Sequence, residues 1–494
     1  ATAEPTDEAT AEPTDEATAE PTDEATAEPT AEPTAEPVVG TQGDGDIGAS
    51  ALTGSWTTAY IGIQNLTANA ATGQLDLYNG TNTTAFQSTA VALNASGGAT
   101  IVSADILNDG AHAGVLVMDQ SVSVAALNLN PTDKLGDFYT GFSNPSSTAY
   151  CPRVLRNWAG FQTRLHIQNA HASAQDITVE TFRFAPSVLG ATKTYLSVPP
   201  NTQFTVDVAN DSDYDGFGTG NGAGGYGKIT GASGNIAVVC DNFQDNSGGA
   251  SFNVESMIQG IPVAFAGQEL IAPRVSNEFF NQRTGINVAN IGGATTDVSV
   301  EYTTASYQGS TPATYNSPAV SLADGEGANF SFNKISQFPQ DTFGSARILS
   351  TASDVVAVIG TNKISPWKGG GEIPAFPSTG AATNNASIPL TFHSNSWRST
   401  VNVMAFNAGT VINAKWVKAN VDPTVAGNTV DSTTQTTTLT NETVFFTDLA
   451  NISNSGGTDT PWGVYISADG PIIAVLNLSD SGTAINAQLL GPNY

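Results

Sequence analysis

Three aspartates with the spacing of a calcium loop are the sharpest chemical feature of this sequence. The segment DSDYDG places Asp211, Asp213 and Asp215 at alternate positions before Gly216. Alternating carboxylates followed by a glycine are typical of the first half of a calcium-binding loop. The glutamate that closes an EF-hand loop is replaced here by Gly222, and no flanking helices are predicted. Two interpretations stay open, a surface calcium site or an acidic turn, and no other cofactor is expected.

The two cysteines point to a disulfide rather than to a metal site. Cys151 and Cys240 form no CxxC or Cys/His set, so neither zinc nor haem is expected. In an exported protein a disulfide is favoured, with two buried thiols as the alternative. The four histidines are scattered, and no Ser/His/Asp spacing or GxSxG motif is present. We therefore expect a protein that is not an enzyme.

Charge excludes several classes of partner. The chain has 16 lysines and arginines against 45 acids, a net charge of −29. Nucleic acids and anionic membrane surfaces both require basic patches, so neither is expected as a partner. No apolar run reaches the length of about 18 residues that a transmembrane helix needs. The chain begins with Ala, as a mature form would after signal-peptide removal, so we expect an extracellular, cell-surface location.

Residues 1–37 form a Pro/Thr/Glu-rich tail of low complexity. The octad ATAEPTDE occurs at 1–8, 9–16 and 17–24, and the tail contains no basic or aromatic residue. Such a segment has nothing to bury that would offset the entropy cost of ordering it. Regular prolines and like charges favour an extended spacer of about 3.1 Å per residue.

The rest of the chain repeats four times in a pattern of strands. The first landmark is an alternating strand that ends in asparagine, at Asn65, Asn169, Asn290 and Asn407, which are 104, 121 and 117 residues apart. The second is a strand opened by a glycine, at Gly114, Gly227, Gly344 and Gly463. A continuous apolar strand closes each repeat. A period near 110 residues built from strands predicts an all-β chain of four tandem Ig-like β-sandwich domains. The predicted boundaries are 38–145, 146–266, 267–384 and 385–487, followed by a strand at 488–494.

These residues resemble a known class of protein. Pro-containing strands such as ELIAPRV, strands ending in "QN", Gly-opened strands and closing "AV" strands are similar to the tandem Ig-like repeats of bacterial cell-surface proteins. Those repeats often stand beside a Thr/Pro/Glu-rich stalk. The resemblance covers about 38–494 and implies an exported surface protein, without implying an activity.

The C-terminal segment QLLGPNY resembles the Pro-containing strands centred on Pro152, Pro273 and Pro389. Each of those strands precedes an Asn landmark by 17 or 18 residues, but counting back from Asn65 reaches a segment near Gly48 with little strand character. If the Pro strand opens each domain, the first domain lacks a strand and the C-terminus carries a spare one. If it closes each domain, nothing is vacant. The donor-type strand comprises Gln488, Leu489, Leu490, Gly491, Pro492, Asn493 and Tyr494.

Insertion of that strand into the first domain of the next copy would build a homopolymer. An extended array keeps its two ends more than about 100 Å apart, which favours exchange between copies over pairing within one chain. We therefore predict a structural subunit of an extracellular filament or surface layer. The alternative is a monomeric adhesin or glycan-binding stalk protein.

Two further features bear on glycans. Among the Asn-x-Ser/Thr sequons, Asn82 and Asn94 fall in predicted loops and are the candidate glycosylation sites. Trp56, Trp158 and Trp397 begin or precede Asn strands. They are interpreted as packing at domain ends, with a sugar-binding face as the other interpretation.

Overall fold

A computed structural model describes most of the chain after the tail. The described residues are 38–42, 58–79, 82–102, 112–130, 135–142, 145–158, 160–184, 189–218, 220, 223–244, 254–306, 311–364, 367–378, 382–392, 397–419, 432–438, 444–448, 461–480 and 486–490. The tail 1–37 therefore lies outside them. Contacts divide the chain into Ala1–Thr34 and one compact unit, Ala35–Tyr494.

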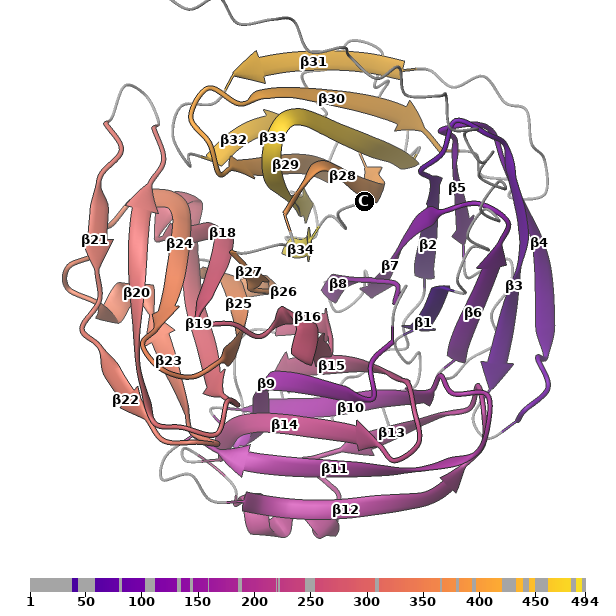
Figure 1. Ribbon diagram of the computed structural model, residues 1–494, viewed down its shortest axis with the longest axis horizontal. Helices are drawn as coiled ribbons and strands as arrows, with labels where there is room; N and C mark the ends of the chain where they lie inside the picture. Colours follow the sequence, from indigo (N-terminus) through magenta and orange to yellow (C-terminus); the bar gives the residue numbers. More distant parts are fainter. Residues whose placement is uncertain are drawn as a thin grey trace, which may run out of the picture. The chain divides into compact units, whose positions relative to one another are not determined.

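The described residues are nearly all β, in several antiparallel sheets (Figure 1). The first repeat contains β1 (Val38–Gln42), β2 (Thr58–Asn65), β3 (Ala71–Asn79), β4 (Gln87–Leu93), β5 (Gly98–Val102), β6 (His112–Met118), β7 (Val122–Asn130) and β8 (Leu135–Thr140). The second contains β9 (Thr148–Trp158), β10 (Phe161–Asn169), β11 (Gln175–Arg183), β12 (Leu189–Val198), β13 (Gln203–Asp207), β14 (Gly224–Gly231), β15 (Ile236–Gln244), β16 (Val254–Gln259) and β17 (Ile261–Pro262).

The third repeat contains β18 (Glu269–Asn277), β19 (Gln282–Asn290), β20 (Thr296–Thr304), β21 (Thr314–Asn316), β22 (Val320–Leu322), β23 (Gly327–Ser331), β24 (Thr342–Ser350), β25 (Val355–Ile364), β26 (Trp367–Pro374) and β27 (Phe376–Pro377). The fourth contains β28 (Thr383–Phe392), β29 (Trp397–Ala405), β30 (Val411–Lys418), β31 (Ser432–Thr438), β32 (Val444–Asp448), β33 (Pro461–Asp480) and β34 (Asn486–Leu490). The described 3-10 helices are η2 (Ser212–Phe217), η4 (Val263–Phe265), η5 (Phe279–Asn281) and η6 (Phe332–Lys334). Among these helices, none has both the length and the apolar character that a membrane crossing requires.

The same strand pairings recur along the chain. The Pro-containing strands β9, β18 and β28 pair with the Gly-opened strands β14, β24 and β33. The Asn strands β2, β10 and β19, and β29 in the fourth repeat, pair with the apolar strands β7, β15, β25 and the second half of β33. Each Pro strand therefore pairs with strands that follow it in the chain.

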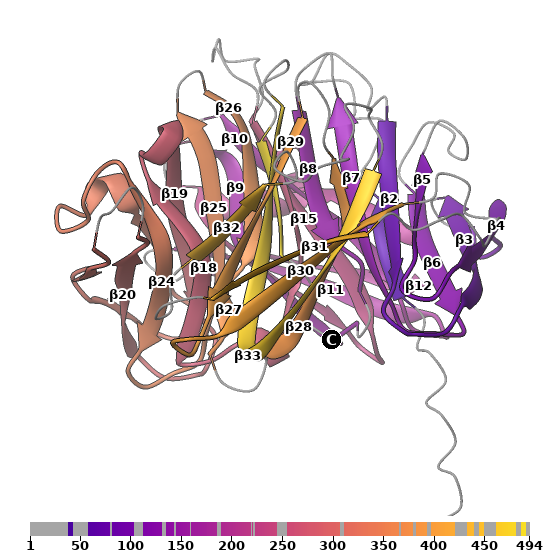
Figure 2. The same ribbon diagram turned by 90° about the horizontal axis from the view of Figure 1, so that it is seen from above.

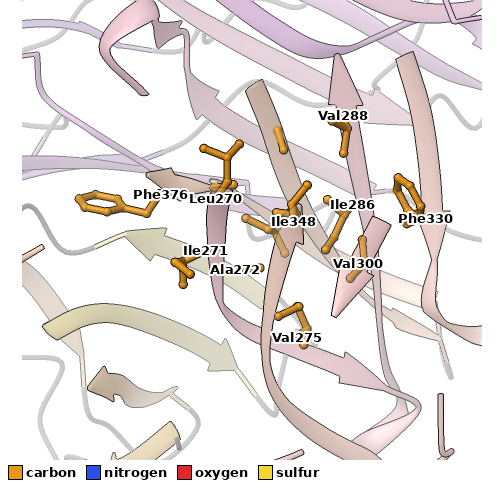
Figure 3. Close-up of a cluster of buried hydrophobic side chains, with 14 of the residues drawn as sticks. Leu270, Ile271, Ala272, Val275, Ile286, Val288, Val300, Phe330, Ile348 and Phe376 are labelled. Atoms are coloured by element: carbon orange, nitrogen blue, oxygen red, sulfur yellow. The ribbon is translucent and has the colours of Figure 1, made fainter. Parts of the chain in front are cut away.

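Alternation along these strands sets their two faces. In β19, Ile286 and Val288 enter the core of the third repeat, which Figure 3 shows in close-up. Because successive side chains of a strand point to opposite faces, Gly285, Asn287 and Ala289 lie on the other face. That second face meets the preceding repeat.

The Asn landmark has a structural explanation in a buried turn. Asn290 is fully buried, and its Nδ2 donates to the carbonyl oxygens of Ala294, Leu322 and Ala323 at 2.7–3.1 Å. Its Oδ1 accepts a hydrogen bond from the backbone N–H of Gly292 at 3.2 Å. Asn65 and Asn169 make the corresponding bonds in their own repeats. The side chain thus satisfies backbone groups that a buried strand end would otherwise leave unpaired.

The vacant place predicted in the first repeat is not vacant, and that prediction was wrong. Strand β1 pairs with β6, and Gly40 faces Gly114 as Cys151 faces Gly227 in the second repeat. Counting back a constant distance from the Asn strand passed over β1, because 15 residues separate β1 from β2. In the second repeat, β10 follows β9 almost at once.

The C-terminal strand also has a partner within its own chain. Strand β34 pairs with β33, with Leu489 opposite Leu476 and Leu490 opposite Val475. It holds the place of β8, β16 and β26, which pair with the apolar strands of their repeats, rather than the place of a Pro strand. A short apolar run fits either place, so the sequence pattern alone did not separate them. The remaining residues of the predicted donor strand, Gly491, Pro492, Asn493 and Tyr494, lie outside the described residues.

Each repeat packs one sheet face against the repeat before it. Val356 and Val358 of β25 join the hydrophobic cluster of the second repeat. Ile473 and Val475 of β33 join that of the third repeat in the same way. The repeated use of one face shows that the repeats share a common mode of packing.

These contacts also connect the fourth repeat to the first (Figures 1 and 2). Leu127 joins the cluster of the fourth repeat, and the rings of Tyr60 and Phe392 meet edge to face at 5.1 Å. Val239 of the second repeat packs with Tyr139 of the first. The contacts between repeats therefore form a closed order, and the expected extended array was wrong. The physical reason is that one face of each Asn and apolar strand pair is hydrophobic and must be covered.

Candidate functional site

A pocket of about 350 Å³ lies between the second and third repeats. Strand β9 lies against β19 and β25 there. The lining residues are basic, aromatic or amide-bearing for the most part, and they are Arg153, Trp158, Phe161, Arg283, Thr284, Gly285, Asn287, Asn329, Ser331, Asn333, Lys334, Gly360 and Asn362. The described lining contains no carboxylate, although acids outnumber bases 45 to 16 in the whole chain. The pocket thus collects three cations in a strongly acidic protein.

Two opposed glycines contribute a part of the pocket wall that bears no side chains. Gly285 of β19 is the direct partner of Gly360 of β25. Partners in an antiparallel ladder point to the same face of the sheet. Neither glycine has a positive φ among the described backbone angles. Backbone conformation therefore does not require glycine here, and the missing side chains leave the space open.

The other repeats fill the corresponding position. Counted from the Asn end of each ladder, the same pair is Tyr60 and Leu127 in the first repeat and Arg164 and Asp241 in the second. In the fourth repeat it is Thr400 and Asn477. In the first repeat the tyrosine ring packs on Phe392, as described above. The pocket is therefore a local departure of the third repeat from the common packing.

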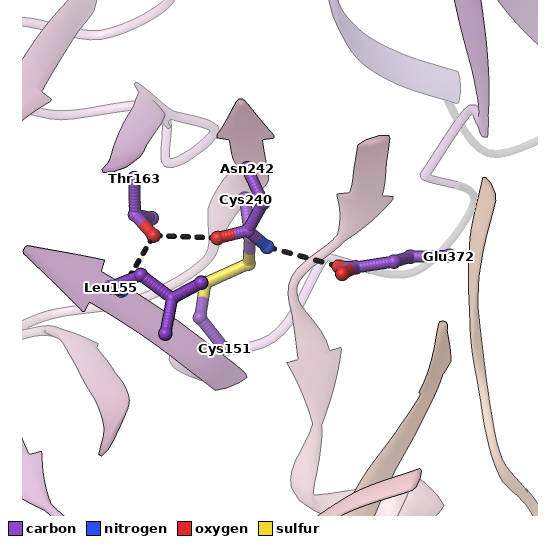
Figure 4. Close-up of a disulfide and its surroundings, with 6 residues drawn as sticks. All are labelled: Cys151, Leu155, Thr163, Cys240, Asn242 and Glu372. Carbon is purple, nitrogen blue, oxygen red and sulfur yellow. Dashed lines mark hydrogen bonds between the residues drawn. A yellow bond between two sulfur atoms is a disulfide. The ribbon is translucent and has the colours of Figure 1, made fainter. Parts of the chain in front are cut away.

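A buried chain of hydrogen bonds holds Arg153 at the pocket (Figure 4). Arg153 Nη1 donates to Glu372 Oε1, and the side chain of Glu372 is 1% exposed. Asn242 Nδ2 donates to Glu372 Oε2 at 2.9 Å, and Thr163 Oγ1 donates to Asn242 Oδ1 at 2.5 Å. The chain crosses from the second repeat to the third. A buried ion pair with its remaining valences satisfied fixes the guanidinium in one orientation.

The Arg153 guanidinium also lies over an aromatic wall. Its Cζ is 5.0 Å from the centroid of the Phe161 ring, within the range of a cation–π interaction. Trp158, at the end of β9, lines the pocket as well. Of the two interpretations of this tryptophan from sequence, its position at a domain end and its place in a pocket wall are both seen.

The other two cations are less fully compensated. Arg283 Nη2 pairs with Glu278 Oε1, but Arg283 Nε is buried without a hydrogen-bond partner. Lys334 is exposed and makes no ion pair among the described residues. Asn329 Nδ2 donates to Asn287 Oδ1 at 2.8 Å, which orients the two amides. Donor capacity therefore remains for an anionic or polar ligand.

The three aspartates considered for calcium are held by cations of the chain itself. Lys193 Nζ lies 3.0 Å from Asp211 Oδ2 and 2.5 Å from Asp213 Oδ2, and Asp215 pairs with Arg156. Asp211 caps η2 by accepting the N–H of Asp213 at 2.9 Å. The described residues contain no group of three or more side chains placed to hold a metal ion. The structure therefore gives this segment the geometry of an acidic turn.

Two of these groups have shifted pKa values. The hydrogen bond to Asp213, followed by the interactions with Asp211, raises the pKa of Lys193 despite partial burial. For Asp211 burial acts to raise the pKa, but the N–H of Asp213 and the Lys193 ammonium outweigh it, and the pKa is lowered. Both shifts favour the charged forms of the pair.

The remaining candidate residues take ordinary structural places. Cys151 and Cys240 form a disulfide between β9 and β15, with their Cα atoms 6.0 Å apart (Figure 4). Asn82 is exposed, whereas Asn94 is partly buried and its carbonyl oxygen accepts the Asn65 side chain. The disulfide lies beside the buried chain of bonds that positions Arg153, so it supports the pocket wall.

Sequence reasoning missed this pocket, although it carried a signal. Residues 285 and 360 are glycines inside strands where the other repeats have side chains. A glycine inside a strand often marks the close approach of another group. Recognising the site also required knowing that Arg153 lies beside residues more than 120 positions later in the chain.

Comparison with known proteins assigns the N-terminal segment only. Residues 4–39 match the family model described as PT disordered repeat. The comparison with curated proteins finds no match. No Ig-like repeat family is identified. These findings support a Thr/Pro-rich, low-complexity segment that precedes the β unit and assign no family to the residues that build the pocket.

Proposed function

We propose that the chain is an exported cell-surface protein whose β unit binds a glycan in the pocket between the second and third repeats. The observation that carries this proposal is the pocket itself, with its glycine pair, two aromatic side chains and several amides. Aromatic faces pack on sugar rings and amides bond to hydroxyl groups, a combination typical of small-molecule sites. The Thr/Pro-rich segment would then act as the stalk, and the four repeats as Ig-like sandwiches packed in one head.

Two observations support export. A disulfide persists in oxidising compartments outside the cytosol. The PT repeat and the absence of a membrane-crossing helix among the described residues are compatible with a surface location. In this function the protein needs no catalytic group, only an oriented binding surface.

The test is binding of the full chain to a panel of immobilised polysaccharides, with sedimentation velocity on the same sample. A monomer that binds one polysaccharide class supports the proposal. Absence of binding to every polysaccharide, together with large assemblies, would reject it in favour of a filament or surface layer.

That polymer is the second candidate, and an exposed edge strand favours it. Strand β12 ends its sheet, and Leu189 and Leu196 on it are 50% and 74% exposed. Long apolar edges pair readily with other chains. Because β34 pairs within its own chain, we propose assembly through such an edge rather than by strand donation. Electron microscopy of the intact chain, of Leu196→Lys and of a chain lacking residues 488–494 separates the two routes.

A further inference from the structure

The charges of the pocket specify the ligand more narrowly than its shape does. Three of the 16 lysines and arginines line one pocket in a chain of net charge −29. One of them, Arg153, is neutralised by Glu372, and Arg283 is paired on one side by Glu278. Lys334 and the Nε edge of Arg283 remain to meet a negative charge. A neutral ligand would leave this donor capacity unused.

The uncharged part of the lining specifies a ring with hydroxyl groups. Trp158 and Phe161 offer aromatic faces, and Asn287, Asn329 and Asn362 offer amides. The Gly285–Gly360 pair lets a ring approach the backbone of the sheet. The volume of about 350 Å³ lies at the lower end of the range of about 300–1,000 Å³ for small-molecule sites. A site of this size suits one sugar residue.

We propose that the pocket binds a carboxylated sugar, with Lys334 and Arg283 as the partners of the carboxylate. A guanidinium fork matches the geometry of a carboxylate, and an exposed ammonium adds a mobile point charge. Arg153, held by Glu372 and stacked over Phe161, acts as a rigid part of the wall rather than as a free cation. The carboxylated sugar is either free or a residue of an acidic polysaccharide. This inference rests on the proposed glycan-binding function and names its ligand class.

Calorimetric titration of the full chain with sodium glucuronate, glucose, glucose 6-sulfate and an oligogalacturonate tests the ligand class. We expect glucuronate to bind, glucose to bind at least about tenfold more weakly, and added salt to weaken glucuronate binding. Tighter binding of the oligomer than of glucuronate identifies a polysaccharide as the source, whereas equal binding identifies a single sugar residue. Equal affinity for glucose, or tighter binding of the sulfated sugar, would overturn the carboxylate proposal while leaving glycan binding intact.

Variants of the pocket test its location. Lys334→Gln should weaken glucuronate binding about tenfold, as for loss of a charge-assisted hydrogen bond, whereas Lys418→Gln on an exposed position of β30 should not. Gly360→Leu, which introduces the residue found at this place in the first repeat, should abolish binding by filling the pocket. Gly267→Ala, outside the pocket, is its matched control. Unchanged binding in Lys334→Gln and in a folded Gly360→Leu would show that the sugar binds elsewhere and would overturn the assignment.

Discussion

Gly285 and Gly360 face each other across β19 and β25, at a position where the first repeat has Tyr60 and Leu127. A Cβ added at Gly285 would meet its nearest neighbour, Asn329 Nδ2, at 3.5 Å, and one at Gly360 would meet Glu372 Oε1 at 3.5 Å. These are ordinary contact distances. The open space between the two repeats is thus produced by residue choice and not by backbone geometry.

Replacing either glycine by alanine should therefore preserve or raise stability. Gly285→Ala and Gly360→Ala each reduce the conformational entropy of the unfolded chain, which favours folding by about 0.5–1 kcal/mol. Urea denaturation followed by fluorescence measures the change. As a contrast, Gly344→Ala should destabilise, since its Cβ would lie 2.0 Å from the carbonyl oxygen of Thr303. Destabilisation by the first two variants would mean that the pocket is packed more tightly than described.

Two arginines at equivalent places in their repeats should respond in opposite ways to replacement by methionine. Arg274 follows Pro273 as Arg153 follows Pro152, and its side chain bonds to Gln282 while Nε and Nη1 lack partners. Burial lowers the pKa of Arg274 to about 10. Because an unpaired buried charge is unfavourable, Arg274→Met should leave stability unchanged or raise it by about 1–3 kcal/mol.

Arg153→Met should instead be destabilising. It leaves Glu372 buried without its cation, and breaking a buried pair costs about 3–5 kcal/mol. The double variant Arg153→Met with Glu372→Gln should recover part of this loss. Chemical denaturation of all four proteins measures the differences, and a similar loss in Arg274→Met and Arg153→Met would contradict the distinction between paired and unpaired arginines.

The disulfide should contribute strongly to stability. It closes a loop with a sequence separation of 89 residues, which corresponds to about 4–5 kcal/mol in the chain-entropy model. Replacing Cys151 and Cys240 together by serine should lower the unfolding midpoint in urea, and reduction of the parent protein should have the same effect. A reductant that changes the midpoint of the serine variant as well would show an effect unrelated to this bond.

Stability should fall in acid partly through Asp211. Its folded-state pKa lies below its ordinary value of 3.8, so the unfolded chain takes up the proton first as the pH falls. The contribution of Asp211 to stability is therefore present above about pH 4 and is lost as the pH drops through the folded-state pKa. Asp211→Asn should lose less stability between pH 6 and pH 3 than the parent protein does.

Lys193→Met tests the origin of that effect. Removal of the ammonium takes away one of the groups that lower the pKa of Asp211, so the acid dependence should also become shallower. Thermal unfolding at several pH values provides the comparison. An unchanged slope in both variants would show that other carboxylates dominate the acid response.

Local features of the fold could be predicted because they depend on neighbours in the chain. Alternation of apolar residues indicated the strands, and the recurring Asn65, Asn169 and Asn290 marked strand ends that each asparagine closes through bonds to its own turn. The antiparallel, nearly all-β character followed from the same patterns. A short apolar run such as that containing Leu489 and Leu490 was ambiguous, since its place in a sheet depends on the partner strand.

The site depends on residues that are distant in the chain. The contact between Arg153 and Glu372 spans 219 positions, and it exists because one sheet face of the third repeat is buried against the second. The amino acids already specified strands, a disulfide-competent pair and glycines at 285 and 360. Whether those glycines open to solvent or to a neighbouring repeat is set by the packing of hydrophobic faces, a long-range free-energy balance that no local pattern encodes.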